Sequence, residues 1–181
     1  GGNWNKYFET KNIVNRGISG DTTFGVLARL EEIYYYKPTD VFLLIGINDI
    51  FNTNSPNRES ITPLSVANNI ISIAESIHKN SSKTKVHIQT TLPINNRLYK
   101  ELTGTFPIHA VPLQDQIKQI NSIIKKKSSQ NHYTVIDLYV IFLDSDELLS
   151  GKYTSDGVHL NEEGYLRWSN FISNYISLST S

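Results

Sequence analysis

The stretch VFLLIG, residues 41–46, is an unbroken run of apolar side chains that ends in a glycine. A short continuous run of this kind is typical of a strand that is covered on both faces of a parallel sheet. The letters GIND, residues 46–49, follow at once, so polar side chains stand where such a strand would end. We therefore interpret 41–46 as an inner strand of a parallel sheet.

Segments of the same two kinds recur on both sides of this run. Residues 12–16, 86–91 and 133–138 are predicted as further strands. Apolar residues at helical spacing predict helices over 22–36, over 66–78 and around 117–124. A last helix, capped by Asn161, carries apolar side chains along one face: Tyr165, Trp168, Ile172, Tyr175 and Ile176. Strands that alternate with helices indicate one α/β domain with a parallel sheet over residues 1–181.

Two long stretches are irregular: Asn, Ser and Pro dominate residues 51–63, and residues 93–113 contain three Pro. Loops longer than about 12 residues are uncommon and often functional, so both are candidate substrate-contacting loops. Arg58, Arg97, Tyr99 and Phe106 lie in them as possible contact residues, with surface insertion as the equal alternative. The run Tyr34-Tyr35-Tyr36 is interpreted as helix packing.

The composition excludes several classes of protein. Lys plus Arg and Asp plus Glu both number 17 in 181 residues, so nothing favours a nucleic-acid partner. The chain has no Cys, which excludes disulfides and thiolate sites, and His78, His87, His109 and His132 show no metal-ligand spacing. No apolar run approaches the roughly 20 residues that span a bilayer. The chain also has no Met, so we expect it not to be a complete translation product; localisation stays open, with periplasm or secretion slightly favoured.

Three polar clusters fall where strands end: SGDTT (19–23), GINDI (46–50) and SDGVH (155–159). In an open parallel sheet, ligands bind at the carboxyl ends of the strands, so we expect the clusters to converge. His159 could then act as a general base, with Asp156 on its far nitrogen to fix the tautomer.

An acyl-transfer site also needs donors for the oxyanion of the tetrahedral intermediate. The backbone N–H of Gly20 and the side-chain amide of Asn48 are the candidates. Asp21 and Asp49 are expected to brace these loops. Taken singly, each cluster also has an ordinary structural explanation: an Asp-rich turn, a tight glycine turn and a helix cap.

Taken together and in this order, the clusters resemble the SGNH (GDSL-type) hydrolase family. NRGISGDTT (15–23), GIND (46–49) and DGVH (156–159) are similar to its second, third and fifth sequence blocks. QTTLPINN (89–96) and YTSDGVHLNEEGYLRW (153–168) look like the branch of small acyl esterases related to platelet-activating-factor acetylhydrolase and carbohydrate acetylesterases. The resemblance implies a flavodoxin-like three-layer α/β/α sandwich, ester hydrolysis through an acyl-serine, and no metal or organic cofactor.

The family's first block, Gly-Asp-Ser at the end of the first strand, is absent from these 181 residues. The resemblance therefore implies that the chain starts just beyond its nucleophile and lacks its first strand, so we expect the isolated chain to be poorly stable. Ser19 and Ser155 are the alternative nucleophiles, although neither is predicted at a strand-to-helix turn.

The expected function is a serine esterase whose partner is a small-molecule ester, with acetyl groups on carbohydrate as the first choice. A lysophospholipase-like lipid esterase is the second. The rival class is a hydrolase-like binding protein without catalysis, which applies if the nucleophile is truly lost. The oligomeric state cannot be read from the sequence.

Overall fold

The computed structural model describes residues 4–8, 12–51 and 61–176. Its centre is a parallel sheet in which β1 (Asp40–Leu43), β2 (Lys85–Gln89) and β3 (Thr134–Ile136) lie side by side in that order. Val41 pairs with Val86, and Ile88 pairs with Val135. The predicted α/β class with a parallel sheet is therefore confirmed.

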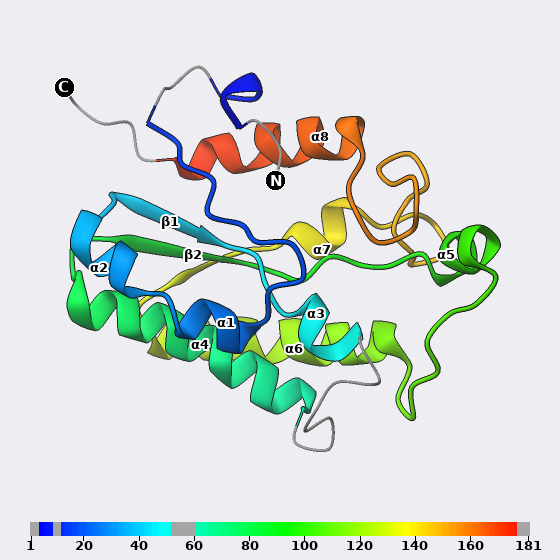
Figure 1. Cartoon of the computed structure of the whole chain (residues 1–181), viewed down its shortest axis with the longest axis horizontal. Coiled ribbons are helices and arrows are strands. Elements are labelled where there is room, and N and C mark those ends of the chain that lie inside the picture. Colours follow the sequence, from blue (N-terminus) through cyan, green and yellow to red (C-terminus); the bar gives the residue numbers. More distant parts are fainter. Residues whose placement is uncertain (1–3, 9–11, 52–60, 177–181) are drawn as a thin grey trace.

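Helices cover both faces of this sheet (Figure 1). The lower layer in the view holds α1 (Thr23–Leu27), α2 (Glu31–Tyr36), α3 (Ile47–Phe51), α4 (Pro63–Asn80) and α6 (Leu113–Lys127). The upper layer holds α8 (Glu162–Ile172) and the 3-10 helix η1 (Trp4–Lys6). The shorter elements are α5 (Asn96–Thr103), α7 (Leu138–Ile141), η3 (Ser128–Gln130) and η4 (Ser173–Tyr175). The result is the expected α/β/α sandwich.

Each face of the sheet has its own hydrophobic core. Below the sheet, α4 and α6 bury apolar stripes at helical spacing: Ile70, Ile73 and Ile77 on α4, and Ile117, Ile120 and Ile124 on α6. Above it, Trp168 and Ile172 of α8 pack with Ile136 and Phe142. The indole Nε1 of Trp168 donates a 2.6 Å hydrogen bond to Oε1 of Gln89 at the end of β2, which fixes α8 across the sheet.

Two of the long helices begin at side-chain caps. Asn161 caps α8 by accepting from Gly164 N at 2.9 Å, as predicted. Helix α4 begins three residues before its predicted start at 66. The side chain of Thr62 accepts from Ser65 N at 3.1 Å and Pro63 follows it, so α4 starts with a capping box and a preset φ.

One strand prediction is wrong, and another is confirmed only in its first part. Residues 12–16 do not join the sheet, and Val14 is 67% exposed. The strand predicted over 41–46 ends at Leu43, and Leu44 is 40% exposed instead of buried. No described strand pairs with the second side of β1. Among the described strands β1 is therefore an edge, and Leu44 beyond its end is not covered by a neighbouring strand.

Two helix predictions also need correction. The helix predicted over 22–36 is divided into α1 and α2 at residues 28–30. The stretch 93–113 is not wholly irregular, because α5 lies inside it and its three prolines all fall outside the helix. In the run of three tyrosines, Tyr35 and Tyr36 are exposed and contact each other edge-on, so only Tyr34 packs on the core.

Candidate active site

Asp156 and His159 form a direct pair on the turn before α8. Nδ1 of His159 lies 2.7 Å from Oδ2 of Asp156, and the His159 backbone N–H donates to Oδ1 at 2.8 Å. The Val158 N–H donates to the same oxygen at 2.9 Å. A carboxylate held on Nδ1 in this way directs Nε2 outward as the ring's free nitrogen.

The turn that carries this pair is anchored from two sides. The Thr154 hydroxyl donates to the carbonyl of His159 at 2.7 Å and accepts from the Gly157 N–H at 2.9 Å. The Asn95 N–H donates to the carbonyl of Gly157 at 2.7 Å. Gly157 has a φ of +83°, and a Cβ there would lie 2.3 Å from the Asn95 carbonyl oxygen. Only glycine therefore allows this close approach between the turn and the start of α5.

The electrostatics of the pair keep Asp156 ionised. Partial burial raises the pKa of its carboxyl, but hydrogen bonds from the His159 ring and backbone and from the Val158 N–H outweigh this and lower the pKa to about 2. The His159 side chain is 81% exposed, and its Nε2 has no hydrogen-bond partner among the described residues. An exposed imidazole with a fixed carboxylate behind it is arranged to exchange a proton with an incoming group.

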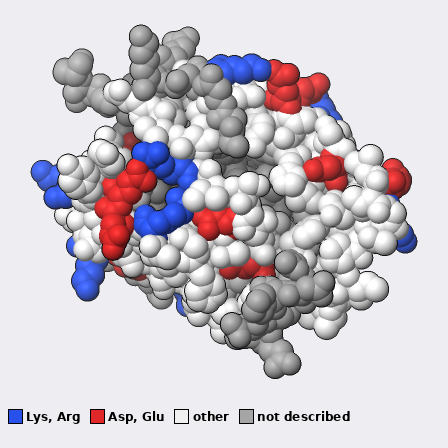
Figure 2. All heavy atoms as spheres, in the orientation of Figure 1, with Lys and Arg blue, Asp and Glu red and all other residues white. Residues whose placement is uncertain are grey.

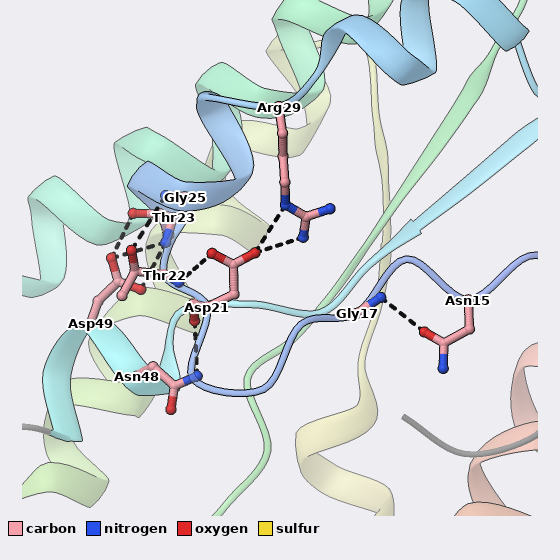
Figure 3. Close-up of polar contacts among 9 residues, drawn as sticks. All are labelled: Asn15, Gly17, Asp21, Thr22, Thr23, Gly25, Arg29, Asn48 and Asp49. Carbon is pink, nitrogen blue, oxygen red and sulfur yellow. Dashed lines mark hydrogen bonds and ion pairs between the residues drawn. The ribbon is translucent and has the colours of Figure 1, made fainter.

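The two predicted oxyanion donors lie on segments that are joined by a hydrogen bond between Asn48 and Asp21 (Figure 3). Nδ2 of Asn48 donates to the carbonyl of Asp21 at 2.8 Å, which brings the amide next to Gly20. One amide proton is used in this bond and the other remains available. Gly20 has a φ of +76°, and within the described part of the chain its N–H donates to no other residue.

Asp49 sits beneath this turn as a buried acceptor. Its carboxylate accepts from the Thr23 hydroxyl at 2.6 Å and from the Thr23 N–H at 3.0 Å, and Asn69 of α4 donates to the same hydroxyl at 3.0 Å. Burial raises the pKa of Asp49, while the hydrogen bonds from Thr23 act in the opposite direction. The hydrogen bonds between Asp49 and Thr23 connect α3, which carries Asn48, to the start of α1.

The Asp21 side chain forms an ion pair with the guanidinium of Arg29. Its Oδ2 accepts from Nη2 of Arg29 at 2.6 Å and from Nε at 3.1 Å, while Oδ1 accepts from the Thr22 N–H at 2.9 Å. Arg16 pairs with Glu32 nearby, and Figure 2 shows charged side chains gathered over α1 and α2. The Asp21 carboxylate thus holds the loop against α1.

An aromatic cluster that sequence reasoning missed joins the two turns. The rings of Phe51 (α3), Tyr99 (α5) and Phe106 meet edge-on, with centroids 5.5 to 6.0 Å apart. Phe51 lies one helical turn after Asn48, and α5 begins next to the residue that holds Gly157. The sequence predicts Tyr99 and Phe106 only as possible substrate contacts. Arg97 instead pairs with Asp146 at 2.6 Å, and Arg58 lies outside the described residues.

All these parts lie toward the carboxyl ends of the strands, on the right of Figure 1. No hydrogen bond joins His159 to Asn48, and none joins it to a serine hydroxyl, within the described ranges. Ser19 and Ser155 therefore do not complete a triad here.

No group of three or more metal-ligating side chains is found in the described part of the chain. None of the described helices is long and apolar enough to cross a membrane.

A three-layer α/β/α protein with an Asp–His pair and oriented amide donors has the parts of an acyl-transfer site. The model of the GDSL-like lipase/acylhydrolase family matches residues 1–167. The chain therefore belongs to this family of hydrolases, and the predicted resemblance is confirmed.

Individual relatives agree with this assignment. The chain is 26% identical over 167 residues to the platelet-activating factor acetylhydrolase IB subunit alpha1 of Rattus norvegicus, covering 90% of this chain and 62% of that protein. It thus spans about three fifths of the length of the curated relatives it matches. A GDSL-like lipase from Bacteroides thetaiotaomicron is similar with a TM-score of 0.77 and 25% identity, covering 95% and 78% of the two chains. An acetyl xylan esterase matches with a TM-score of 0.69 and 20% identity, covering 89% and 79%, and shows the shared fold.

Proposed function

We propose that this chain is the acid–base and oxyanion part of a serine esterase. The observation that carries the proposal is the 2.7 Å bond between His159 Nδ1 and Asp156, which leaves Nε2 of an exposed imidazole without a described partner. His159 takes the proton of a serine hydroxyl as it attacks the ester carbonyl and returns it to the leaving alcohol. Asp156 fixes the tautomer and stabilises the imidazolium.

The oxyanion that forms in this step needs donors in fixed positions. Asn48 has one amide proton tied to the Asp21 carbonyl, which orients the other, and the Gly20 N–H lies in the same turn. Loss of one such donor lowers kcat about 10²- to 10³-fold in comparable sites. The Asp49 and Thr23 pair holds this turn against the body of the protein.

The nucleophile is the part that the described residues do not supply. We propose that a Gly-Asp-Ser segment on a further strand, encoded before Gly1, provides it. Two observations support a strand at this position: the second side of β1 has no described partner strand, and Leu44, which directly follows β1, is 40% exposed. The coding sequence upstream of Gly1 is the direct test, because a strand without Ser there would contradict the proposal.

The substrate we propose is a short-chain ester, first an acetyl group on a carbohydrate. The acetyl xylan esterase of the same fold is compatible with this choice. The similarity to an acetylhydrolase of platelet-activating factor supports the second choice, a phospholipid or lysophospholipid ester. Initial rates on acetylated xylo-oligosaccharides and on acetyl- and long-chain lysophospholipids separate the two.

The decisive variant is His159→Ala in the protein expressed with the residues that its gene encodes before Gly1. We expect kcat for p-nitrophenyl acetate to fall at least about 10⁴-fold, because the general base is lost. His132→Ala is the matched control, since His132 is also an exposed histidine on a carboxylate, 3.1 Å from Glu75, yet lies elsewhere. Retained activity in His159→Ala would refute the assignment.

The rival proposal is a non-catalytic binding protein with a hydrolase fold. A serine-directed fluorophosphonate probe discriminates between them: labelling of the wild-type protein that is lost on prior denaturation supports the esterase. Absence of labelling, together with binding of an acylated sugar, would favour the rival.

A further inference from the structure

A hollow of about 630 Å³ lies on the outer side of the last helix, between α7, α8 and residues 152–153. It is lined by Lys152 and Tyr153 and by one face of α8 and η4 that includes Glu163, Arg167, Asn170 and Asn174. None of these side chains takes part in the acyl-transfer site described above. Tyr153 precedes Asp156 by three residues, so the hollow is near that turn in sequence but formed by different groups.

Arg167 is positioned at the wall of this hollow by one hydrogen bond and one ring contact. Its Nε donates to the carbonyl of Ile141 at 2.8 Å, and its guanidinium carbon lies 5.2 Å from the centre of the Tyr153 ring. The Tyr153 ring is itself held edge-on by Phe142, with centroids 5.5 Å apart. The two terminal nitrogens of Arg167 have no partner among the residues the structure describes. A guanidinium fixed in this way presents a pre-oriented fork of N–H donors.

The charges around the hollow favour an anion. Lys152 has its Nζ 5.6 Å from the centre of the Tyr153 ring and 3.7 Å from a carboxylate oxygen of Glu163. The lining therefore holds two cations and one carboxylate, and Arg167 forms no ion pair within the described residues. Because both cations lie over Tyr153, the ring is not a free platform on which a neutral sugar could stack.

The amides of Asn170 and Asn174 complete the lining. They stand one helical turn apart beyond Arg167, both are exposed, and each offers a donor and an acceptor. Such groups orient a ligand whose charge is bound by the guanidinium. We propose that the hollow is an anion-binding site, separate from the ester-hydrolysing site, that takes the carboxylate or phosphate group of a small molecule.

The test is a binding measurement on the chain itself, so its result does not depend on ester hydrolysis. Inorganic phosphate and glucuronate are titrated separately into the protein at low ionic strength, and NMR shifts of the Arg167 Nε–H and the Asn170 amide are followed. We expect saturable binding of at least one probe with a Kd below about 10 mM. The probe that binds more tightly identifies phosphate or carboxylate as the source of the charge.

Three variants make the assignment specific. Arg167→Gln should weaken binding roughly tenfold or more, because a charge-assisted fork is lost, and Arg167→Lys should give an intermediate Kd. Glu163→Gln should tighten binding, since it removes the competing carboxylate. As the control, Lys126→Gln on α6 removes one positive charge from the opposite layer and should leave the Kd unchanged.

Each variant is first compared with wild type by its amide fingerprint spectrum, and the Arg167→Lys and Glu163→Gln variants keep the proposal testable if Arg167→Gln does not fold. The proposal is overturned if neither probe saturates. It is equally overturned if Lys126→Gln weakens binding as much as Arg167→Gln, which would mean attraction to the overall charge of the protein.

Discussion

Asp49 shows how one buried side chain can hold a turn in place through hydrogen bonds. It is 3% exposed, it accepts from both the hydroxyl and the N–H of Thr23, and Thr23 is fully buried. Buried polar groups that lose their partners retain the full cost of their desolvation. The carboxylate therefore contributes to stability through the groups it satisfies.

We expect Asp49→Ala to lower the free energy of unfolding by about 1–3 kcal/mol, because the Thr23 N–H and hydroxyl lose their acceptor. Asp49→Asn should cost less, since its amide oxygen can still accept one of the two hydrogen bonds. Urea unfolding followed by circular dichroism measures both changes. Equal losses in the two variants would show that charge, and not hydrogen-bond satisfaction, is what matters at this position.

The lowered pKa of Asp156 predicts how the stability of the folded protein depends on pH. Its pKa in the folded protein is lowered to about 2, below the ordinary value of 3.8. A carboxyl with a lowered folded pKa stabilises the protein above its unfolded pKa, and this contribution is lost as the pH falls through the folded pKa. The loss should therefore occur between about pH 4 and pH 2.

In Asp156→Asn this part of the acid sensitivity should disappear, because the amide does not titrate. The measurement compares urea midpoints of the variant and the wild type at pH 6, 4, 3 and 2. The difference between the two proteins should shrink as the pH falls. A constant difference over this range would contradict the role of Asp156 in acid stability.

At the scale of elements, the Asp156–His159 turn and α5 depend on each other through Gly157. Their contact needs both a positive φ and the absence of a Cβ at this position. The dependence is long-range, because Asn95 lies far earlier in the chain. The sequence does not predict helix α5, because the three prolines around it indicate a loop.

Gly157→Ala tests this contact, with Gly104→Ala as its matched control. Both glycines have positive φ, +83° and +77°, but a Cβ at Gly104 meets nothing within 4 Å, whereas at Gly157 it lies 2.3 Å from the carbonyl oxygen of Asn95. Positive φ alone costs roughly 1–2 kcal/mol. We therefore expect about that loss in Gly104→Ala and a larger loss in Gly157→Ala by urea unfolding. Equal losses would mean that the turn moves freely away from α5.

At the scale of the whole molecule, β1 is the weak side of the sheet. One side of it is paired with β2, and no described strand covers the other. Leu44, which directly follows this strand, is exposed, and so are Val14 and Ile18 on the segment before α1. Unpaired strand edges with apolar neighbours favour association with other chains.

We therefore expect the isolated 181-residue chain to unfold in a broad transition centred below about 45 °C, under the usual range of mesophilic domains. Scanning calorimetry measures the transition, and light scattering reports whether the chain associates. A sharp cooperative transition at high temperature would show that this sheet is complete enough to be stable as it stands. Addition of the proposed preceding strand should raise the midpoint.

The sequence by itself determined the local features of this protein. Helix periodicity, the cap at Asn161 and the Asp156–His159 pair all depend on residues within a few positions of one another, so their spacing is visible in the letters. The sequence also indicates the family, because the motifs that define it are short and contiguous.

Only the tertiary structure decided which described strand lies at the edge, how Asn48 is oriented by the Asp21 carbonyl, and how α5 holds the turn at Gly157. It also decided that Arg167 faces a hollow with its terminal nitrogens unpartnered among the described residues. These features join residues that lie far apart in the chain, 26 positions for Arg167 and Ile141 and 27 for Asn48 and Asp21. Such contacts require the intervening chain to be closed at an entropic cost that packing of the two cores offsets, and no local pattern records which distant partners will meet.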